Sequence, residues 1–400
     1  MTSDFTVEVE DVLARVKAFY DAEMAPRHGA WIEAAATTGL DAPFVSDLRD
    51  KARGLGLWNL GMADLPDGAP GTRISNLDFV PVAELMGQLP WGSKVFNCHA
   101  PDLPNMILLN AVANDAQRAK WLGPLLNGTA SASFAMTEPD VASSDATNIE
   151  TSIRADGDDY VINGRKWYIT GAADPELSFH LVMGVTDPEA PRNARHSIVI
   201  VPADTEGIEL VRELRFMGWR DHSAPIGELL FRDVRVPREN LLGTEGGGFA
   251  AAQSRLGPAR IHHAMRCLGL AEMLLGLMRD RVTKRQAFGR NFDSFDNLQH
   301  WIAEARIEIE KNRLFVRHAA GMLDRMSFSA CWPEISMVKV SVARMLQTIA
   351  DRCVQIHGAA GGSDDFLIHH AFVYGRMFRI ADGPDEVHLR QIYKHEERRT

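Results

Sequence analysis

The sequence lacks the features of membrane-spanning, disulfide-rich and nucleic-acid-binding proteins. No uncharged apolar stretch reaches about 18 residues, the length that a membrane-spanning helix requires. The 53 Asp and Glu residues outnumber the 43 Lys and Arg residues, so the net charge is -10 and no basic arm is present for a polyanion or an anionic membrane. The cysteines are widely separated and form no CxxC pair, which argues against a disulfide scaffold and a zinc site. They are Cys98, Cys267, Cys331 and Cys353.

The N-terminus has little resemblance to an export or transit signal. Its first dozen residues contain four acidic side chains, whereas a signal peptide carries a basic start followed by an apolar run. These are Asp4, Glu8, Glu10 and Asp11. Together with the absence of a disulfide framework, this composition predicts a cytoplasmic protein.

Several catalytic motifs are also missing. The sequence has no Walker A, HExxH or GxSxG motif, and no GxGxxG between a strand and a helix, so the corresponding hydrolase and protease interpretations lose their support. The pairs His262–His263 and His369–His370 consist of adjacent residues. On a helix, adjacent side chains point about 100° apart, so neither pair can direct both rings at one metal. We interpret these histidines as solvent-facing or core residues and predict no metal site.

What the sequence does contain is the composition of a globular enzyme, 46% hydrophobic and 24% charged over 400 residues. Residues 1–130 are predicted to be helical. Val12, Val16 and Phe19, with their neighbours Leu13 and Tyr20, form one apolar face at helical spacing, and Pro26 is expected to end that helix soon after.

Residues 131–245 change to a β pattern. Asn163–Gly164 separates two β-prone runs and predicts a hairpin turn, because both residues tolerate positive φ. Further apolar runs occupy residues 181–185, 198–201 and 229–236, separated by turn-forming clusters. Since no amphipathic helices are interleaved, the pattern favours an antiparallel β-barrel or sandwich over a βαβ sheet.

Residues 246–400 return to helical spacing. Apolar residues recur every three or four positions over 264–282 and 335–349, and every seven positions over 302–323. The prediction is therefore an α+β fold of several lobes: an N-terminal α-helical domain (1–130), a middle β domain (131–245) and a C-terminal four-helix bundle (246–400).

The most specific segment is Phe134–Asp145, at the start of the β region. It combines an apolar wall with hydroxyl groups and a proline-stiffened turn, a mixture that suits a flat heteroaromatic ring with polar edges. The wall is Phe134 and Met136, and the hydroxyl groups belong to Thr137, Ser143 and Ser144. With its TEP and later Ser-Asp, this segment resembles the flavin-contacting segment of the acyl-CoA dehydrogenase family.

Three later segments resemble the same family in order and spacing. Lys166–Thr170 resembles its segment beside the flavin ring, Arg285–Gly289 its RxxFG motif, and Gln355–Gly358 its QxxGG motif. The amino-acid sequences of the segments that begin at Thr137 and at Ala381 resemble those of one subgroup of the family. This subgroup consists of the dehydrogenase portion of the large animal acyl-CoA dehydrogenases that also carry a kinase-like domain, together with stand-alone bacterial relatives.

The resemblance implies an FAD flavoprotein of lipid metabolism and fatty acid β-oxidation. It implies an electron-transferring flavoprotein as electron acceptor, and a homo-oligomer, a dimer or a homotetramer, whose FAD sites are shared between subunits. Arg285 is expected at the pyrophosphate, because the arginine fork donates bidentately to phosphate oxygens. The implied cofactor-binding residues are Phe134, Met136, Thr137, Ser143, Ser144, Trp167, Tyr168, Ile169, Thr170, Arg285, Phe288, Gln355, Gly358, Pro384 and Glu386.

The resemblance also implies a catalytic base. Most family members place a glutamate near the C-terminus, and Asp382 stands at that position here, one methylene shorter. Some members carry the base on the first long C-terminal helix instead, but that position is Ala259, which cannot accept a proton. Ser144, Arg260 and Gly383 are the implied substrate-binding residues, with Ser143 as the alternative to Ser144.

The expected reaction is α,β-dehydrogenation of an acyl-CoA thioester to the 2-enoyl-CoA. Asp382 removes the α-proton, the β-hydride passes to flavin N5, and hydrogen bonds to the thioester carbonyl supply the acidity that the α-carbon lacks. Three alternatives stay open: a nitroalkane-oxidase-like flavin oxidase, an enzyme that processes 4-hydroxy- or 4-phospho-acyl-CoA, and a flavin- or CoA-binding protein without turnover.

Overall fold

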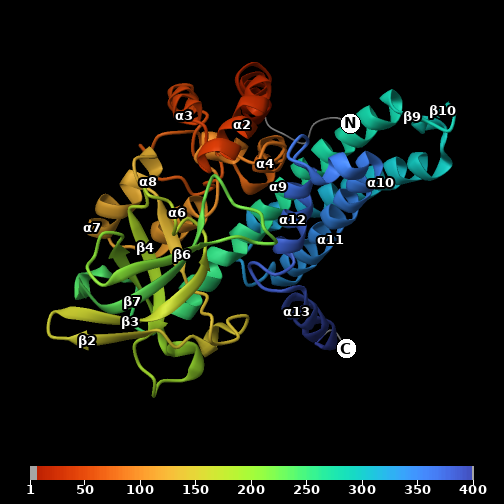
Figure 1. Ribbon diagram of the computed structural model, residues 1–400. Helices are drawn as coiled ribbons and strands as arrows, with labels where there is room; N and C mark the ends of the chain where they lie inside the picture. The colour runs from red at the N-terminus through yellow and green to blue at the C-terminus, as the bar shows by residue number, and fades with distance from the viewer. Residues whose placement is uncertain (1–6, 399–400) are drawn as a thin grey trace. The chain divides into compact units, whose positions relative to one another are not determined.

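The computed structural model describes residues 7–398, and its chain forms two compact units (Figure 1). One unit, here the helical unit, takes residues up to 36, residues 74–93 and residues from 257 onward. The other, here the sheet unit, takes residues 37–73 and 94–256. Helices come first along the chain, then strands, then helices again, which confirms the predicted fold class. The division into three domains at residues 130 and 245 stays a prediction.

The sheet unit is built on eight strands in the order β6-β7-β3-β2-β4-β5-β8, with β1 paired to β4. The strands are β1 (Ala132–Ala135), β2 (Ser152–Asp156), β3 (Asp159–Ile169), β4 (Phe179–Val185), β5 (His196–Pro202), β6 (Ile208–Leu214), β7 (Ile226–Pro237) and β8 (Leu241–Leu242). Two features correct the sequence-based picture. Over the described strands the sheet stays open instead of closing into a barrel, and β4 pairs in parallel with β1 and β2.

The predicted hairpin at Asn163–Gly164 is wrong. Both residues lie inside β3, where the register with β7 shifts between Ile162 and Gly164, so the pair forms a bulge. The bulge is held in place because Asn163 Nδ2 donates to Asp233 Oδ1 (3.0 Å) and Asp233 N donates to Asn163 Oδ1 (2.8 Å). A Cβ on Gly164 would lie 2.3 Å from Thr151 Oγ1, so glycine is required here by close packing.

The sheet unit also contains helices that precede its first strand along the chain. They are α3 (Phe44–Gly54), α6 (Asp102–Val112), α7 (Asp115–Gln117), the π-helix η3 (Arg118–Leu122) and α8 (Gly123–Asn127). Helix α6 contacts β1, and Asn105 Nδ2 donates to the Ala132 carbonyl while Ala132 N donates to Asp102 Oδ1, both at 2.8 Å. These bonds fix the start of β1, the strand that leads into the Phe134–Asp145 segment.

The helical unit is centred on α11 (Trp332–His357), which contacts α10 (Asp296–Leu323), α12 (Ile368–Phe378) and α13 (Asp385–Glu397) (Figure 1). Helix α9 (Gly248–Lys284) joins this unit from residue 257, and a short hairpin of β9 (Gln286–Ala287) and β10 (Arg290–Asn291) follows it. Further helices of the unit are α1 (Val7–Phe19), η1 (Tyr20–Met24), η2 (Ala25–Arg27) and α4 (Asn76–Gly87). Helices α2 (His28–Thr38) and α5 (Gly92–Val95) begin in this unit and end in the sheet unit.

The helical predictions are confirmed in their main features. Val12, Val16 and Phe19 are buried on one face of α1, and the apolar repeats of the C-terminal region fall within α9, α10 and α11. Helix α13 adds a fifth helix to the predicted four-helix bundle. Among the described residues, no helix is both long and apolar enough to cross a membrane.

Candidate active site

Asp382 lies in the short connection between α12 and α13 of the helical unit. Its backbone is left-handed (φ 55°), as is that of Gly383 (φ 100°), and Pro384 occupies the N-cap position of α13. This conformation is rare for a residue with a side chain and is maintained only where the surroundings fix it. The side chain of Asp382 is 16% exposed, so the carboxylate is largely shielded but still accessible.

Three buried side chains hold the backbone of this connection; we call Arg260, Lys339 and His388 the carbonyl cage. Arg260 Nε on α9 donates to the Asp382 carbonyl (2.8 Å), and His388 Nε2 on α13 lies 3.2 Å from the same oxygen. Lys339 Nζ on α11 donates to the Gly383 carbonyl. Because a carbonyl can only accept, the His388 ring must carry its proton on Nε2.

Burial shapes the charges of the carbonyl cage. It lowers the pKa of Arg260 to about 10 and that of Lys339 to about 8, so both are still cations at neutral pH. Burial, together with these two positive charges, lowers the pKa of His388 to about 4, which makes the ring a neutral donor. The cage therefore places two cations beside Asp382, and both interact electrostatically with it.

The first turn of α13 is anchored separately. Asp385 is buried and accepts from Arg379 Nε (2.9 Å) and Arg344 Nε (3.3 Å), while its own N–H donates to the Arg379 carbonyl (3.1 Å). His388 Nδ1 lies 3.0 Å from Ser336 Oγ on α11. The connection that carries Asp382 is thus fixed on both sides. The predicted residue Glu386 is exposed on this first turn, and Pro384 is half-buried.

A histidine that the sequence-based interpretation assigned to solvent or core lies beside this carboxylate. His263 Nε2 is 3.6 Å from Asp382 Oδ2, although the two residues are far apart in sequence. Its neighbour His262 is buried against Phe79 instead, and burial lowers its pKa to about 3. The sequence shows only that His262 and His263 are adjacent, so that their rings point in different directions. It does not show which of the two rings lies beside Asp382. No group of three or more His, Cys, Asp or Glu residues within the described chain could hold a metal.

In the sheet unit, the Phe134–Asp145 segment begins on β1 and is held by a buried ion pair. Lys166 Nζ on β3 donates to Glu138 Oε1 (2.9 Å), to the Met136 carbonyl (2.9 Å) and to the Met183 carbonyl (2.7 Å). Glu138 also accepts from the N–H groups of Glu150 and Thr151, both at 2.8 Å. Burial would raise the pKa of Glu138, but Lys166 and these donors outweigh it and the pKa is lowered.

The end of β3 runs beside this segment, because Trp167 N donates to the Thr137 carbonyl (3.0 Å). Tyr168 has positive φ (51°) and is 40% exposed, so the strand leaves its regular path here. Five of the predicted cofactor residues are half-buried and accessible along these two stretches: Phe134, Met136, Thr137, Trp167 and Thr170. Ile169 differs from them, because its side chain is buried in the core of the sheet.

The two candidate serines have different surroundings. Ser143 Oγ accepts from Glu138 N (2.9 Å), so this hydroxyl closes the turn that follows Glu138. Ser144 is exposed. Of the two, Ser144 is the serine whose hydroxyl the fold leaves accessible to a substrate.

The other predicted flavin motifs lie in the helical unit, away from its Asp382 connection. Arg285 and Phe288 belong to the β9–β10 hairpin, where Phe288 is 95% exposed, and Gln355 and Gly358 are exposed at the C-terminal end of α11. Arg281, one turn before Arg285, donates from Nη2 to the His357 carbonyl (3.3 Å) and so joins the two motifs. Its Nε is buried without a hydrogen-bond partner.

These surfaces fit FAD on structural grounds. A buried arginine N–H without a partner, beside an open glycine turn at Gly358, suits a phosphate oxygen. The accessible aromatic and hydroxyl groups of the sheet unit suit the edges and face of a heteroaromatic ring.

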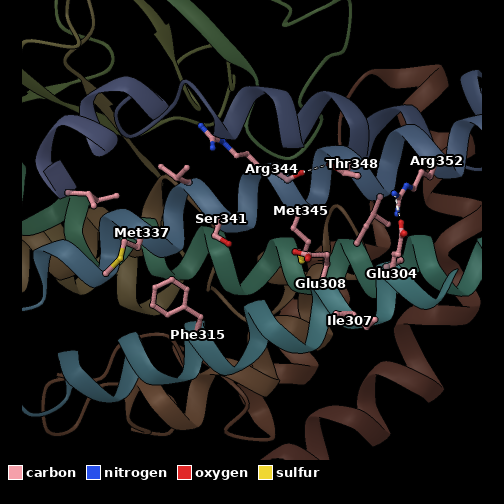
Figure 2. A pocket seen from close by; sticks show the side chains of 14 residues that line it. Glu304, Ile307, Glu308, Phe315, Met337, Ser341, Arg344, Met345, Thr348 and Arg352 are labelled. Carbon is pink, nitrogen blue, oxygen red and sulfur yellow. Dashed lines mark hydrogen bonds and ion pairs between the residues drawn. The ribbon is translucent and has the colours of Figure 1, made fainter. Parts of the chain in front are cut away.

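A separate hollow of about 640 Å³ lies along α10, α11 and α13, and Figure 2 shows its lining. It contains none of the predicted site residues. The ion pair Arg352–Glu304 (2.6 Å) lies in its lining, and Arg344, another lining residue, pairs with Asp385. The predicted chemistry therefore lies outside this hollow.

Comparison with known protein families decides the assignment of the chain. The model of the acyl-CoA dehydrogenase middle domain matches residues 133–234, and that of the acyl-CoA dehydrogenase C-terminal domain matches residues 246–396. The chain belongs to the acyl-CoA dehydrogenase family. It is accordingly an FAD-dependent oxidoreductase that acts on the CH–CH bond of an acyl-CoA.

Individual relatives agree with this assignment. "Probable acyl-CoA dehydrogenase FadE2" of Mycobacterium tuberculosis is 45% identical over 88% of this chain and 86% of its own. "Acyl-CoA dehydrogenase family member 11" of Rattus norvegicus is 41% identical over 97% of this chain, which spans only 50% of that relative's length. A solved structure from Mycobacterium abscessus, assigned to the acyl-CoA dehydrogenases, superposes with a TM-score of 0.94 at 41% identity and covers 98% of this chain and 99% of its own.

Proposed function

We propose that the chain converts an acyl-CoA thioester to the 2-enoyl-CoA with Asp382 as the base that removes the α-proton. The observation that carries this proposal is the carbonyl cage, which fixes the backbone of an accessible carboxylate and surrounds it with two buried cations. The other base position of the family offers no competitor, because Ala259 is 1% exposed and has no proton-accepting group.

The chain's own groups can supply the steps around proton removal. Asp382 accepts the α-proton, and its backbone N–H is proposed to donate to the thioester carbonyl, so that negative charge developing on that oxygen is stabilised. Arg260 and His388 hold the Asp382 carbonyl, and this fixes the backbone of the residue whose N–H group is proposed to donate. A shorter base requires such positioning, because a displacement of about 1 Å can cost about 100-fold in rate.

Bound FAD supplies the acceptor, at its N5 atom, for the hydride that leaves the β-carbon. We propose that Phe134, Met136, Thr137, Trp167 and Thr170 contact its ring system, and that Arg285 and Phe288, with Gln355 and Gly358, reach the FAD of a neighbouring copy in a homo-oligomer. An electron-transferring flavoprotein is the proposed electron acceptor, and a cytoplasmic location stays a prediction from the acidic N-terminal residues.

A basic hollow in the sheet unit supports binding of the CoA portion. It has a volume of about 910 Å³, is lined in part by residues that follow Ser144 in the same loop, and includes Arg154, Arg192 and Arg195. Arginine forks match phosphate oxygens, which CoA carries in its nucleotide portion. Local positive charge of this kind is compatible with an acidic chain as a whole.

The proposal is tested by anaerobic titration of the FAD-loaded protein with a panel of acyl-CoA thioesters, following bleaching of the flavin absorbance. In the variant Asp382→Asn the side chain keeps its size and loses its basicity, so we expect the rate of flavin reduction to fall by about 10²–10⁴-fold. Bound FAD per protein, measured from the absorbance ratio, should be unchanged.

Reduction of Asp382→Asn at the wild-type rate, with FAD still bound, would refute the assignment of the base. The panel also separates the alternatives. Reduction by a nitroalkane with peroxide formed, and none by any acyl-CoA, would indicate a nitroalkane oxidase. FAD that stays oxidised with every compound would indicate a binding protein without turnover. Inclusion of 4-hydroxy- and 4-phospho-acyl-CoA tests the remaining alternative.

A further inference from the structure

A polar cluster on α9 and α12 surrounds the imidazole that lies next to Asp382. His263 Nδ1 is 2.8 Å from Arg266 Nη2 on the same helix and 2.7 Å from the Tyr374 hydroxyl on α12. Its other nitrogen, Nε2, is 3.6 Å from Asp382 Oδ2. The ring thus has a guanidinium on one side and a carboxylate on the other. The side chains of His263 and Asp382 are 20% and 16% exposed, so both are largely shielded from solvent.

The guanidinium determines which nitrogen of His263 carries the proton. Arginine has only donors, so the nitrogen that lies 2.8 Å from Arg266 must accept and cannot carry a proton. In the neutral ring the proton is therefore on Nε2, the nitrogen that lies 3.6 Å from Asp382 Oδ2. A second proton would have to enter between the ring and the Arg266 cation, which opposes it.

The charged and titratable groups near this pair lie on four helices. Helix α9 contributes Arg260 and Arg266, α11 contributes Lys339, α12 contributes Tyr374, and α13 contributes the neutral His388 and the paired Asp385. Arg260 and Lys339 hold carbonyl oxygens of the connection, and Asp385 is bound by Arg344 and Arg379. His263 contacts the carboxylate group itself, because its Nε2 lies 3.6 Å from Asp382 Oδ2.

We infer that His263 is a positioning residue for Asp382: as the neutral Nε2–H tautomer imposed by Arg266, it donates toward the carboxylate, orients it and favours its ionised form. This inference rests on the proposed role of Asp382 as the base. The separation of 3.6 Å is slightly longer than a hydrogen bond, and we expect it to shorten when substrate binds, because catalytic hydrogen bonds are often long before the complex forms.

The test compares His263→Gln, which keeps an amide N–H donor at a similar reach, with His263→Leu, which removes it. The measured quantity is the pH dependence of the rate of flavin reduction by an acyl-CoA under anaerobic conditions. For His263→Leu we expect the acidic limb of the profile to move to higher pH by about one unit and the rate at neutral pH to fall about tenfold. For His263→Gln we expect the wild-type limb and a rate within about threefold.

Exposed His300 on α10 provides a matched control, because His300→Leu makes the same change away from the site and should leave the profile unchanged. A loss of rate in His263→Leu without any shift of the limb, or the same profile for the Gln and Leu variants, would overturn the inference. Bound FAD and the melting temperature are measured for each variant, so that a folding defect is recognised as such.

A second readout does not depend on turnover. In the FAD-loaded protein with ¹⁵N-labelled histidine, the resonances that disappear in His263→Gln should show a protonated Nε2 and an unprotonated Nδ1 at neutral pH. A proton on Nδ1, or on both nitrogens, would overturn the inference. Failure of the base assignment looks different: Asp382→Asn would then retain wild-type reduction, whatever the tautomer of His263.

Discussion

The buried ion pair of Lys166 and Glu138 provides a quantitative prediction about the loop that carries residues proposed to contact the flavin. The Lys166 side chain is fully buried, and its ammonium group binds one carboxylate and two main-chain carbonyls. The change Lys166→Met keeps most of the apolar length and removes all three bonds. It leaves the Glu138 carboxylate buried, with only main-chain donors to stabilise its charge.

Removing one partner of a buried pair costs about 3–5 kcal/mol, mostly because the remaining charge is uncompensated. We therefore expect Lys166→Met to lower the free energy of unfolding of the sheet unit by about 4 kcal/mol, measured by urea denaturation. The double variant Lys166→Met/Glu138→Gln removes that charge and should recover about half of the loss. Lys51→Met, which alters an exposed lysine on α3, should stay within about 0.5 kcal/mol of wild type.

The same substitution bears on the cofactor. Lys166 anchors the Met136 carbonyl, next to Thr137 in the segment proposed to contact the flavin, so Lys166→Met should weaken FAD binding about tenfold or more in a fluorescence titration. The proposed role of this ion pair is refuted if Lys166→Met lowers the free energy of unfolding by less than about 1 kcal/mol and the variant binds FAD as tightly as wild type. It is also refuted if the Glu138→Gln change adds to the loss instead of relieving it.

Two further predictions concern the buried carboxylate of Asp102 and the connection that carries Asp382. Burial raises the pKa of Asp102 from 3.8 to about 6, so the folded chain binds this proton more tightly than the unfolded chain, and the contribution to stability is lost as pH rises from about 4 through 6. Asp102→Asn keeps an oxygen that can accept from the Ala132 N–H and should remove this pH dependence. In denaturation curves the free energy of unfolding should rise by up to about 3 kcal/mol at pH 7 and by little at pH 4. Equal pH dependence in both proteins would contradict this prediction. Gly383→Ala introduces a Cβ at φ 100° that lies 3.0 Å from His388 Nε2, so the connection must shift at a cost of about 1–3 kcal/mol. The rate of flavin reduction should fall about tenfold with little loss of FAD, and an unchanged rate in stopped-flow measurements would show that the cage does not position the base.

The periodic parts of the fold could be predicted from the sequence because a buried helix face repeats its apolar residues. The repeats over 335–349 fall within α11, and the apolar run over 229–236 lies within β7. The pairing of the strands could not be predicted from the sequence in the same way. Asn163–Gly164 has the composition of a turn, but the partner strand β7 continues past it and the tertiary pairing turns the pair into a bulge. Local propensity yields to such pairing because the bulge retains the ladder on both sides.

The candidate site was predictable where a family motif carries the chemistry and not where contacts between helices create it. Asp382 is visible as a carboxylate at the family's base position. The neighbourhood of His263 is not, because it depends on which face α9 turns toward the α12–α13 connection. Ser143 and Ser144 could not be separated from sequence either, since only the bond from Glu138 N shows which hydroxyl closes the turn.

The same contacts bear on how an aspartate could act as the proposed base, at a position where the resemblance implies a glutamate in most of the family. A longer side chain reaches substrate through rotation about its own bonds, whereas a shorter one must be brought there by its backbone. Here the backbone is held in a left-handed conformation by a guanidinium, an ammonium and a neutral imidazole, and the carboxylate faces a second imidazole whose tautomer is imposed by Arg266. Three of these four groups are buried, so their positions are set by helix packing before substrate arrives. If Asp382 is the base, as proposed, the rigidity of its support compensates for its shorter reach. Substitutions in the supporting helices should then affect the reaction almost as strongly as changes to the aspartate itself.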